Sequence, residues 1–193
     1  FFFFFLSLAY RFSHPIRQKV NSNKMKQFIT ILTFMTVANI SMAQNGTATT
    51  TKTTFSRETT VSINIQANQA IVWSLLTNAS DFPRWNSTIV SIDGNIALGE
   101  KIQLKSTLDT TRTFKLKVKS FEKESSLSWG DGKGDRTYTI TPNGTGGVTF
   151  TMTEKIGGLM FPMYAKYIPS FDESFEQFAA DLKKEAETIH QTK

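Results

Sequence analysis

"SFDESFEQFAADLKKEAETIH", residues 170–190, is the longest amphipathic segment of the chain and decides the fold. Its apolar residues recur at steps of three and four, which predicts a helix from about Phe171 to Ile189 with one apolar face. Ser170 and Glu173 have the spacing of a capping box, so we expect them to cap the first turn. A helix of this kind needs an apolar surface to pack against.

The residues before this helix alternate between apolar and polar side chains in several short runs. Such alternation predicts half-buried strands. The runs are residues 55–67, 101–106, 112–121, 126–130, 136–142 and 147–155. "PNGTGG" at 142–147 and "GDGKGD" at 130–135 are typical of hairpin turns, because Asn and Gly accept a positive φ. In the first run, Phe55, Thr59, Val61, Ile63 and Ile65 share the face expected to point inward.

Two short helices are predicted between the first strand and the others. "NQAIVWSLLTN" at 68–78 has helical spacing with Asn68 as its N-cap, and "ASDFPRW" at 79–85 has Pro83 near its start. A single long sheet curls, and the C-terminal helix is the one large element available to cover its concave face. The sequence therefore predicts an α+β fold in which a curved antiparallel sheet wraps around a long C-terminal helix.

The front of the chain is predicted to be removed or disordered. Residues 25–43, with Lys26 before an apolar run and Ser41-Met42-Ala43 after it, have the pattern of a secretory signal peptide. The apolar run is about half the length that crosses a bilayer. We interpret residues 1–24 as an upstream segment outside the natural protein, residues 44–54 as a disordered leader, and residues 55–193 as a single domain. A periplasmic or secreted location follows.

The net positive charge belongs to the front segment. Of the 22 basic residues, five lie in residues 1–43, which contain no acidic residue. The rest of the chain contains the other 17 basic residues and all 16 acidic ones. The basic composition thus gives no support for nucleic-acid binding. After residue 43 the chain has one histidine, His190, and it has no cysteine. No nucleophilic triad and no His/Cys metal site can be assembled, so we expect neither a metal nor a cofactor.

Five segments together resemble a known family. They are "ANQAIVWSLLTNASDFPRWN", "LGEKIQLK", "RTFKLKVKSFEKESSLSW", "YTITPNGTGGVTFTMTEK" and "FEQFAADLKKEAE", and they cover nearly all of residues 58–188. The chain is similar to the polyketide cyclase/dehydrase-like branch of the START/Bet v 1-like (SRPBCC) superfamily of helix-grip proteins. The resemblance implies an internal cavity between the sheet and the long helix, usually for an apolar or amphipathic small molecule. It implies no reaction, because the family contains carriers, sensors and enzymes.

Strand parity and the apolar face of the C-terminal helix select residues that face this expected cavity, and Trp85 and Trp129 are expected either at its wall or in the packing around it. The apolar candidates are Trp85, Phe114, Leu116, Trp129, Tyr138, Ile140, Phe150, Met152, Phe171, Phe175 and Phe178. Parity also turns three charged residues inward, and in the family topology Arg57, Arg136 and Glu154 should gather at one end of the cavity near Asp131. This polar cluster is either a solvated ionic rim or a grip for the head group of a ligand.

Three functions remain compatible with the sequence. The leading hypothesis is an exported, soluble protein that binds an apolar or amphipathic small molecule by burial, with no catalytic residues. The alternative is a cyclase, aromatase or dehydratase in which Glu154 or Tyr138 serves as general acid or base. A protein-interaction module with a vestigial cavity is the third.

Overall fold

The computed structural model describes residues 46–192, which form one eight-stranded antiparallel sheet and a small set of helices. The strand order across the sheet is β1-β2-β8-β7-β6-β5-β4-β3. The strands are β1 (Thr49–Lys52), β2 (Ser56–Ile65), β3 (Ile89–Asp93), β4 (Lys101–Ser106), β5 (Asp109–Glu122), β6 (Ser126–Gly130), β7 (Gly134–Pro142) and β8 (Val148–Gly157). The helices are α2 (Gln69–Thr77), η1 (Ala79–Asp81), α3 (Phe82–Trp85), α4 (Phe161–Tyr164), η2 (Ala165–Tyr167) and α5 (Asp172–Gln191).

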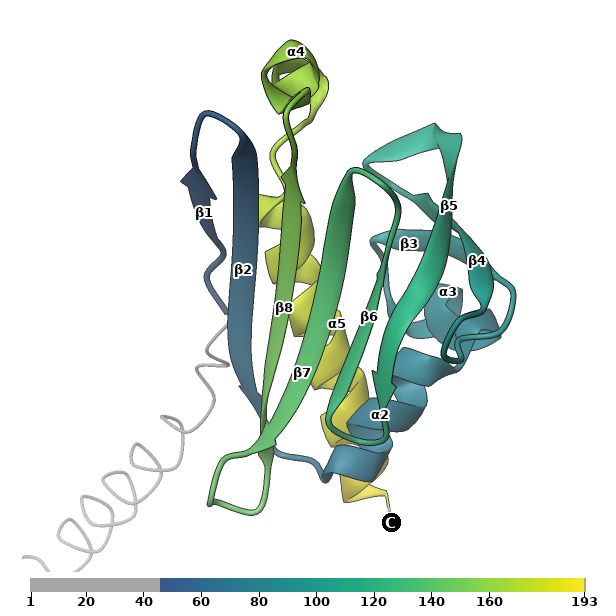
Figure 1. The fold of residues 1–193 in the computed structure, drawn as a ribbon. Coiled ribbons are helices and arrows are strands. Elements are labelled where there is room, and N and C mark those ends of the chain that lie inside the picture. The colour runs from purple at the N-terminus through teal and green to yellow at the C-terminus, as the bar shows by residue number, and fades with distance from the viewer. Residues whose placement is uncertain (1–45, 193) are drawn as a thin grey trace, which may run out of the picture. The chain divides into compact units, whose positions relative to one another are not determined.

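The sheet curls around α5, which confirms the predicted helix-grip fold. In Figure 1 the helix crosses behind the sheet on a diagonal, from the end of β2 and β8 near α4 toward the lower end of β6. Helices α2 and α3 cover the part of the sheet beside the C-terminal half of α5. The upper part of β4 and β5 is left without a helix over it.

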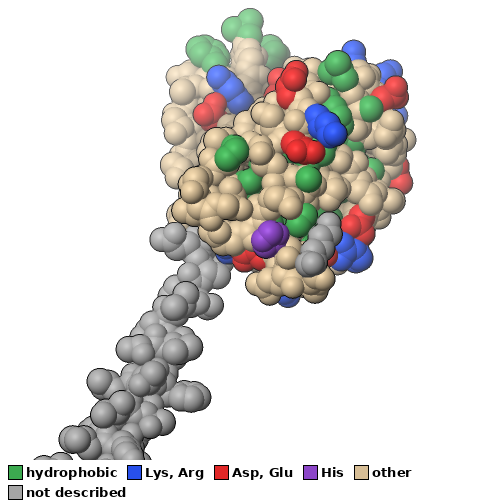
Figure 2. Space-filling view, turned by 90° about the horizontal axis from the view of Figure 1, so that it is seen from below, with side chains coloured by type: hydrophobic (Ala, Val, Ile, Leu, Met, Phe, Trp, Pro, Cys, Tyr) green, Lys and Arg blue, Asp and Glu red, His purple; other side chains and the backbone are tan. Residues whose placement is uncertain are grey.

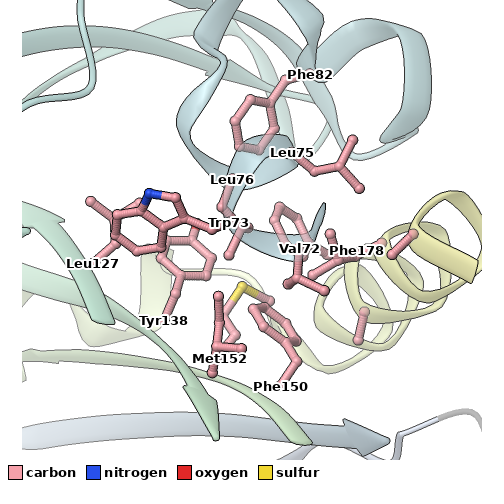
Figure 3. Close-up of a cluster of buried hydrophobic side chains, with 14 of the residues drawn as sticks. Val72, Trp73, Leu75, Leu76, Phe82, Leu127, Tyr138, Phe150, Met152 and Phe178 are labelled. Carbon is pink, nitrogen blue, oxygen red and sulfur yellow. The ribbon is translucent and has the colours of Figure 1, made fainter. Parts of the chain in front are cut away.

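Aromatic and aliphatic side chains fill the space between the sheet and these helices. Figure 3 shows Phe150, Met152 and Tyr138 of the sheet directed toward Phe178 of α5 and Val72 of α2. The ring centroids of Phe150 and Phe178 lie 6.2 Å apart, and those of Tyr138 and Phe178 lie 5.7 Å apart. The centre of the molecule is therefore a packed core.

Two strands are absent from the sequence predictions. Strand β1 lies within residues 44–54, for which the sequence predicts a disordered leader, and it pairs with β2. The prediction of disorder is therefore wrong for residues 46–54. Its threonines are β-branched, and the Thr50 hydroxyl donates a hydrogen bond of 2.5 Å to Asp172 on α5. Strand β3 lacks strict alternation because the register shifts between Ile89 and Ser91. Residues 1–45, with the predicted signal peptide and upstream segment, lie outside the described residues.

Two local predictions at the edges of elements also need correction. Ser170 and Glu173 form no capping box, because the Ser170 hydroxyl donates to the Asp172 carboxylate instead and α5 has no side-chain cap. Phe55 is 52% exposed, since it precedes β2 in the turn after β1. The predicted N-cap Asn68 is confirmed, with its side chain accepting a hydrogen bond from the Ile71 N–H.

Candidate ligand-binding site

The inner face of β5 changes from covered to uncovered along its length. Val118 is fully buried, whereas Leu116 and Phe114, toward the β4–β5 turn, are only partly buried although they point to the same side. Val118 pairs with Trp129 deep in the core, but Leu116 and the residues of β5 before it pair only with β4. An apolar inner face thus remains open in the region that α5 does not cross.

A pocket of about 280 Å³ occupies this region. Its sheet wall consists of apolar side chains from β4, β5 and β6: Leu104, Phe114, Leu116 and Trp129. Ile156 at the end of β8 and the chain between β8 and α5 form the opposite wall, with Tyr164, Tyr167, Ile168, Pro169 and Phe171. The volume is near the lower end of the range for small-molecule sites, about 300–1,000 Å³.

Charged side chains line the rest of the pocket. Three are acidic and three are basic: Asp109, Asp131, Glu154, Arg112, Lys133 and Arg136. The Asp131 carboxylate accepts hydrogen bonds from the Lys133 and Gly134 N–H groups in the turn between β6 and β7. Arg112 lies over the ring of Phe114, 4.6 Å from its centroid. The pocket therefore combines an apolar wall with a polar border, which suits an amphipathic ligand.

Two residues of the predicted polar cluster, Arg136 and Glu154, line this pocket, and Arg57 does not. Arg136 and Glu154 are register partners on β7 and β8, and the Arg136 Nε donates to Glu154 Oε2 at 2.5 Å. Arg57 lies on β2, the neighbour of β8, and on the same face of the sheet as this pair. It is 8% exposed, and its guanidinium lies 4.5 Å from the ring centroid of Phe171. Its Nη1 donates to the Ile168 carbonyl, while Nη2 has no hydrogen-bond partner among the described residues. The chain thus places one buried and one mostly buried guanidinium group near the Glu154 carboxylate.

Burial changes the proton affinity of the groups around this cluster. It lowers the pKa of Arg57, although the negative charges of Glu154 and Asp172 oppose the change. Burial acts in the same direction on Arg136, but the combined contributions of Glu154 and Tyr138 outweigh it and the pKa of Arg136 is raised. The pKa of Tyr138 is raised by burial, against the opposing charge of Arg136, so its hydroxyl stays neutral.

The structure separates the predicted cavity residues into two groups. Phe114, Leu116, Trp129 and Phe171 line the pocket, as do Arg136 and Glu154 of the polar cluster. The other predicted apolar residues lie in the packed core and do not line the pocket: Trp85, Tyr138, Ile140, Phe150, Met152, Phe175 and Phe178. Parity gave the strand residues of both groups the correct face, but α2 and α5 cover those of the core group. Contact of the pocket group with a ligand stays a prediction.

Several pocket residues were not among the sequence candidates. Leu104 and Leu108 come from β4 and the turn after it. A segment interrupted by two prolines supplies Ile156, Tyr164, Tyr167, Ile168 and Pro169. In the sequence, that segment is apolar but has neither a helical nor a strand period. This combination is the signal that could have identified its residues as part of a pocket wall. Among residues 46–192, no group of three or more His, Cys, Asp or Glu side chains is placed to hold a metal ion. No helix in the described part of the chain is long and apolar enough to cross a bilayer.

Solved structures share this fold at low sequence identity. A START superfamily protein from Mycobacterium smegmatis is 15% identical with a TM-score of 0.52, over 68% of this chain and 98% of that one. A point mutant of norcoclaurine synthase from Thalictrum flavum, in complex with a transition-state analogue, is 11% identical with a TM-score of 0.54, over 74% and 98%. A conserved protein of unknown function from Enterococcus faecalis is 12% identical with a TM-score of 0.55, over 74% and 78%.

A match to a protein family covers most of the described residues. No protein of curated function matches the chain. The family described as "Polyketide cyclase / dehydrase and lipid transport" matches residues 56–187, from the start of β2 into the last turns of α5. With its sheet, its gripped helix and this match, the chain belongs to the polyketide cyclase/dehydrase and lipid transport family.

Proposed function

We propose that this protein is an exported carrier that binds one amphipathic small molecule in the pocket beside β5. One observation carries the proposal: the inner face of β5 is apolar and open at Phe114 and Leu116, within a pocket of about 280 Å³. Apolar side chains in such a pocket stabilise a bound ligand because binding removes apolar surface from water. This burial contributes about 25 cal/mol of free energy per Å². The ligand is held by burial, and no covalent step is needed.

The polar border determines how the ligand is oriented. Its apolar part lies against Leu104, Leu116 and Trp129, and its polar end lies toward Arg112 and the Arg136–Glu154 pair. Arg112 forms no ion pair among the described residues, so its guanidinium is free to bind an anionic group. The family description, which includes lipid transport, supports a ligand of this chemistry.

The cyclase or dehydratase alternative has weaker support. Its two candidate acid–base groups are poorly placed, because Tyr138 lies in the core outside the pocket and Glu154 is paired with Arg136. A general acid or base must reach the proton that it transfers, either directly or through one water. Export, predicted from residues 25–43, also favours a carrier of free molecules.

A fluorescent ligand tests the carrier function. A dansyl-labelled fatty acid should bind the wild-type protein with a blue-shifted emission. Leu116→Trp places a larger side chain in the pocket, so it should abolish the signal with little loss of stability. Phe150→Trp is the matched control: it enlarges an apolar residue of the packed core, should cost about 1–3 kcal/mol by overpacking, and should leave the binding affinity unchanged.

Two results would contradict the carrier function. Binding that survives Leu116→Trp would place the fatty acid elsewhere. Turnover of a cyclic or carbonyl substrate that is lost in Glu154→Gln would favour the enzyme alternative instead.

A further inference from the structure

The segment between β8 and α5 is exposed and strongly apolar. Residues 155–171, "KIGGLMFPMYAKYIPSF", contain no acidic residue and two lysines, Lys155 and Lys166. We call residues 157–168 of this stretch the tip segment. It contains α4 and η2, and Figure 1 shows it projecting beyond the end of the sheet.

Exposed apolar side chains gather at this end of the molecule. Eight large hydrophobic residues are more than a third exposed within the described part of the chain. Four belong to the tip segment, with exposed fractions of 83% for Leu159, 57% for Met160, 67% for Met163 and 74% for Tyr167. Two others are adjacent: the Phe55 carbonyl accepts a hydrogen bond from the Gly158 N–H, and Leu108 lines the same pocket as Tyr167.

The opposite end of the molecule has no such concentration. Figure 2 shows it with apolar side chains dispersed among charged ones. The two remaining exposed apolar residues, Val90 and Leu98, belong to β3 and to the loop after it. A contiguous apolar patch on a water-soluble domain marks a surface that another body covers.

Positive charge accompanies the apolar tip. The Lys166 Nζ lies 4.9 Å from the ring centroid of Tyr167, and the Lys133 Nζ lies 5.6 Å from that of Tyr164. Neither lysine forms an ion pair within residues 46–192. Lysine stems and tyrosine rings are amphipathic and suit the boundary between head groups and acyl chains. The cores of protein interfaces are instead depleted in lysine.

The tip is continuous with the pocket. Tyr164, Tyr167 and Ile168 line the pocket from within the same twelve residues that carry Leu159, Met160 and Met163 on the outside. A binding partner that covers the tip segment therefore also covers the side of the pocket that this segment closes. For a pocket that binds amphipathic molecules, a bilayer is both a cover and a source of ligand.

We propose that the tip segment docks on the surface of an anionic lipid bilayer, with Leu159, Met160 and Met163 inserted at the boundary between head groups and acyl chains. Lys166 and Lys133 bind the anionic head groups around the inserted side chains. Docking places the pocket against the bilayer, so a lipid-like ligand passes between the two without crossing water. This last step depends on the proposed function; the docking itself does not.

Vesicle flotation tests the docking directly. Vesicles of phosphatidylcholine alone and of an equimolar mixture with phosphatidylglycerol serve as probes. We expect the wild-type chain to bind the mixed vesicles and Leu159→Asn to bind them roughly tenfold more weakly. Leu98→Asn is the matched control, because Leu98 is 66% exposed in the loop between β3 and β4, and it should bind like the wild type. Lys166→Gln should weaken binding about fivefold on mixed vesicles, whereas Lys184→Gln, on the exposed side of α5, should not.

Site-specific labelling locates the contact. The chain has no cysteine, so Met163→Cys and Leu98→Cys each give one unique attachment point for an environment-sensitive dye. The dye at position 163 should shift to the blue on mixed vesicles, and the dye at position 98 should not. A shift at both positions, or at neither, overturns the proposal.

The outcomes separate docking from ligand binding. If the wild type binds the dansyl-labelled fatty acid in solution but no vesicles, docking is wrong and the carrier function stands. If it binds vesicles through Leu159 but no fatty acid, the carrier function fails and docking stands. Concentration-dependent dimerisation that Leu159→Asn abolishes would show that the tip is covered by a second copy, and that result also overturns docking.

Discussion

Removal of the Glu154 carboxylate should leave Arg136 without its ion-pair partner and Arg57 with Asp172 as its remaining counter-charge. The side chains of Arg136 and Glu154 are 16% and 17% exposed, and Arg57 beside them is 8% exposed. Breaking a fully buried ion pair from one side costs about 3–5 kcal/mol, and an exposed pair contributes about 0–1 kcal/mol. Since roughly five sixths of both side chains are buried, we expect Glu154→Ala to cost about 3 kcal/mol of unfolding free energy.

Urea unfolding at neutral pH measures this loss against a nearby surface pair. Asp135 precedes Arg136 on β7 and forms an ion pair with Lys119 in which the side chains are 51% and 39% exposed. Asp135→Ala should therefore cost no more than about 1 kcal/mol. Replacing both members of the buried pair, Arg136→Met with Glu154→Leu, should restore most of the stability, because no unpaired charge from the pair remains. If Glu154→Ala costs no more than Asp135→Ala, the cluster is solvated and the argument from burial is refuted.

Three further predictions concern the ligand, the pH dependence and the mature N-terminus. Arg112→Gln should weaken binding of a fatty acid several-fold but leave binding of the alcohol of equal chain length unchanged, as titration calorimetry would measure. Hydrogen bonds from Thr50 and Ser170 lower the pKa of Asp172, so its stabilising contribution is present above the ordinary aspartate value and is lost as the pH falls through the lowered one. The stability difference between wild type and Asp172→Asn should therefore shrink upon acidification, and a gap that persists in acid would count against this. N-terminal sequencing of the natural product should begin at Gln44; a start before Met25 would contradict the predicted signal peptide.

Strand parity predicted the inner face well because β7 and β8 are regular. Arg136 pairs with Glu154, Tyr138 with Met152 and Ile140 with Phe150, without a register shift between the two strands. A period of two therefore places all these side chains correctly, charged ones included. The grouping of Arg136 with Glu154 followed from this regularity together with the family topology.

Regularity fails where strands bulge or where few residues carry the pattern. In β3, the buried Ile89 and Ile92 are three positions apart because the register shifts between them, so the segment shows no alternation. Strand β1 has four residues and no apolar side chain. It is held at the edge of β2 by main-chain pairing and by the hydrogen bond from Thr50 to Asp172, which is 122 residues away. Neither feature can be recognised from local composition.

The position of the pocket depends on a difference in length between the elements that grip each other. Helix α5 has 20 residues and is about 30 Å long, whereas the 14 residues of β5 extend over about 46 Å. Because the helix also crosses the sheet diagonally (Figure 1), its N-terminal end lies over β2 and β8 and leaves the β4–β5 end of the sheet uncovered. Parity assigns Phe114 and Phe150 to the same face, but only the crossing of α5 decides that Phe150 is covered and Phe114 is not. The apolar segment before α5 then closes part of the uncovered space and remains exposed on its outer side, so the pocket and the tip have one origin. Shortening the tip should therefore open the pocket while leaving the core around Phe150 packed.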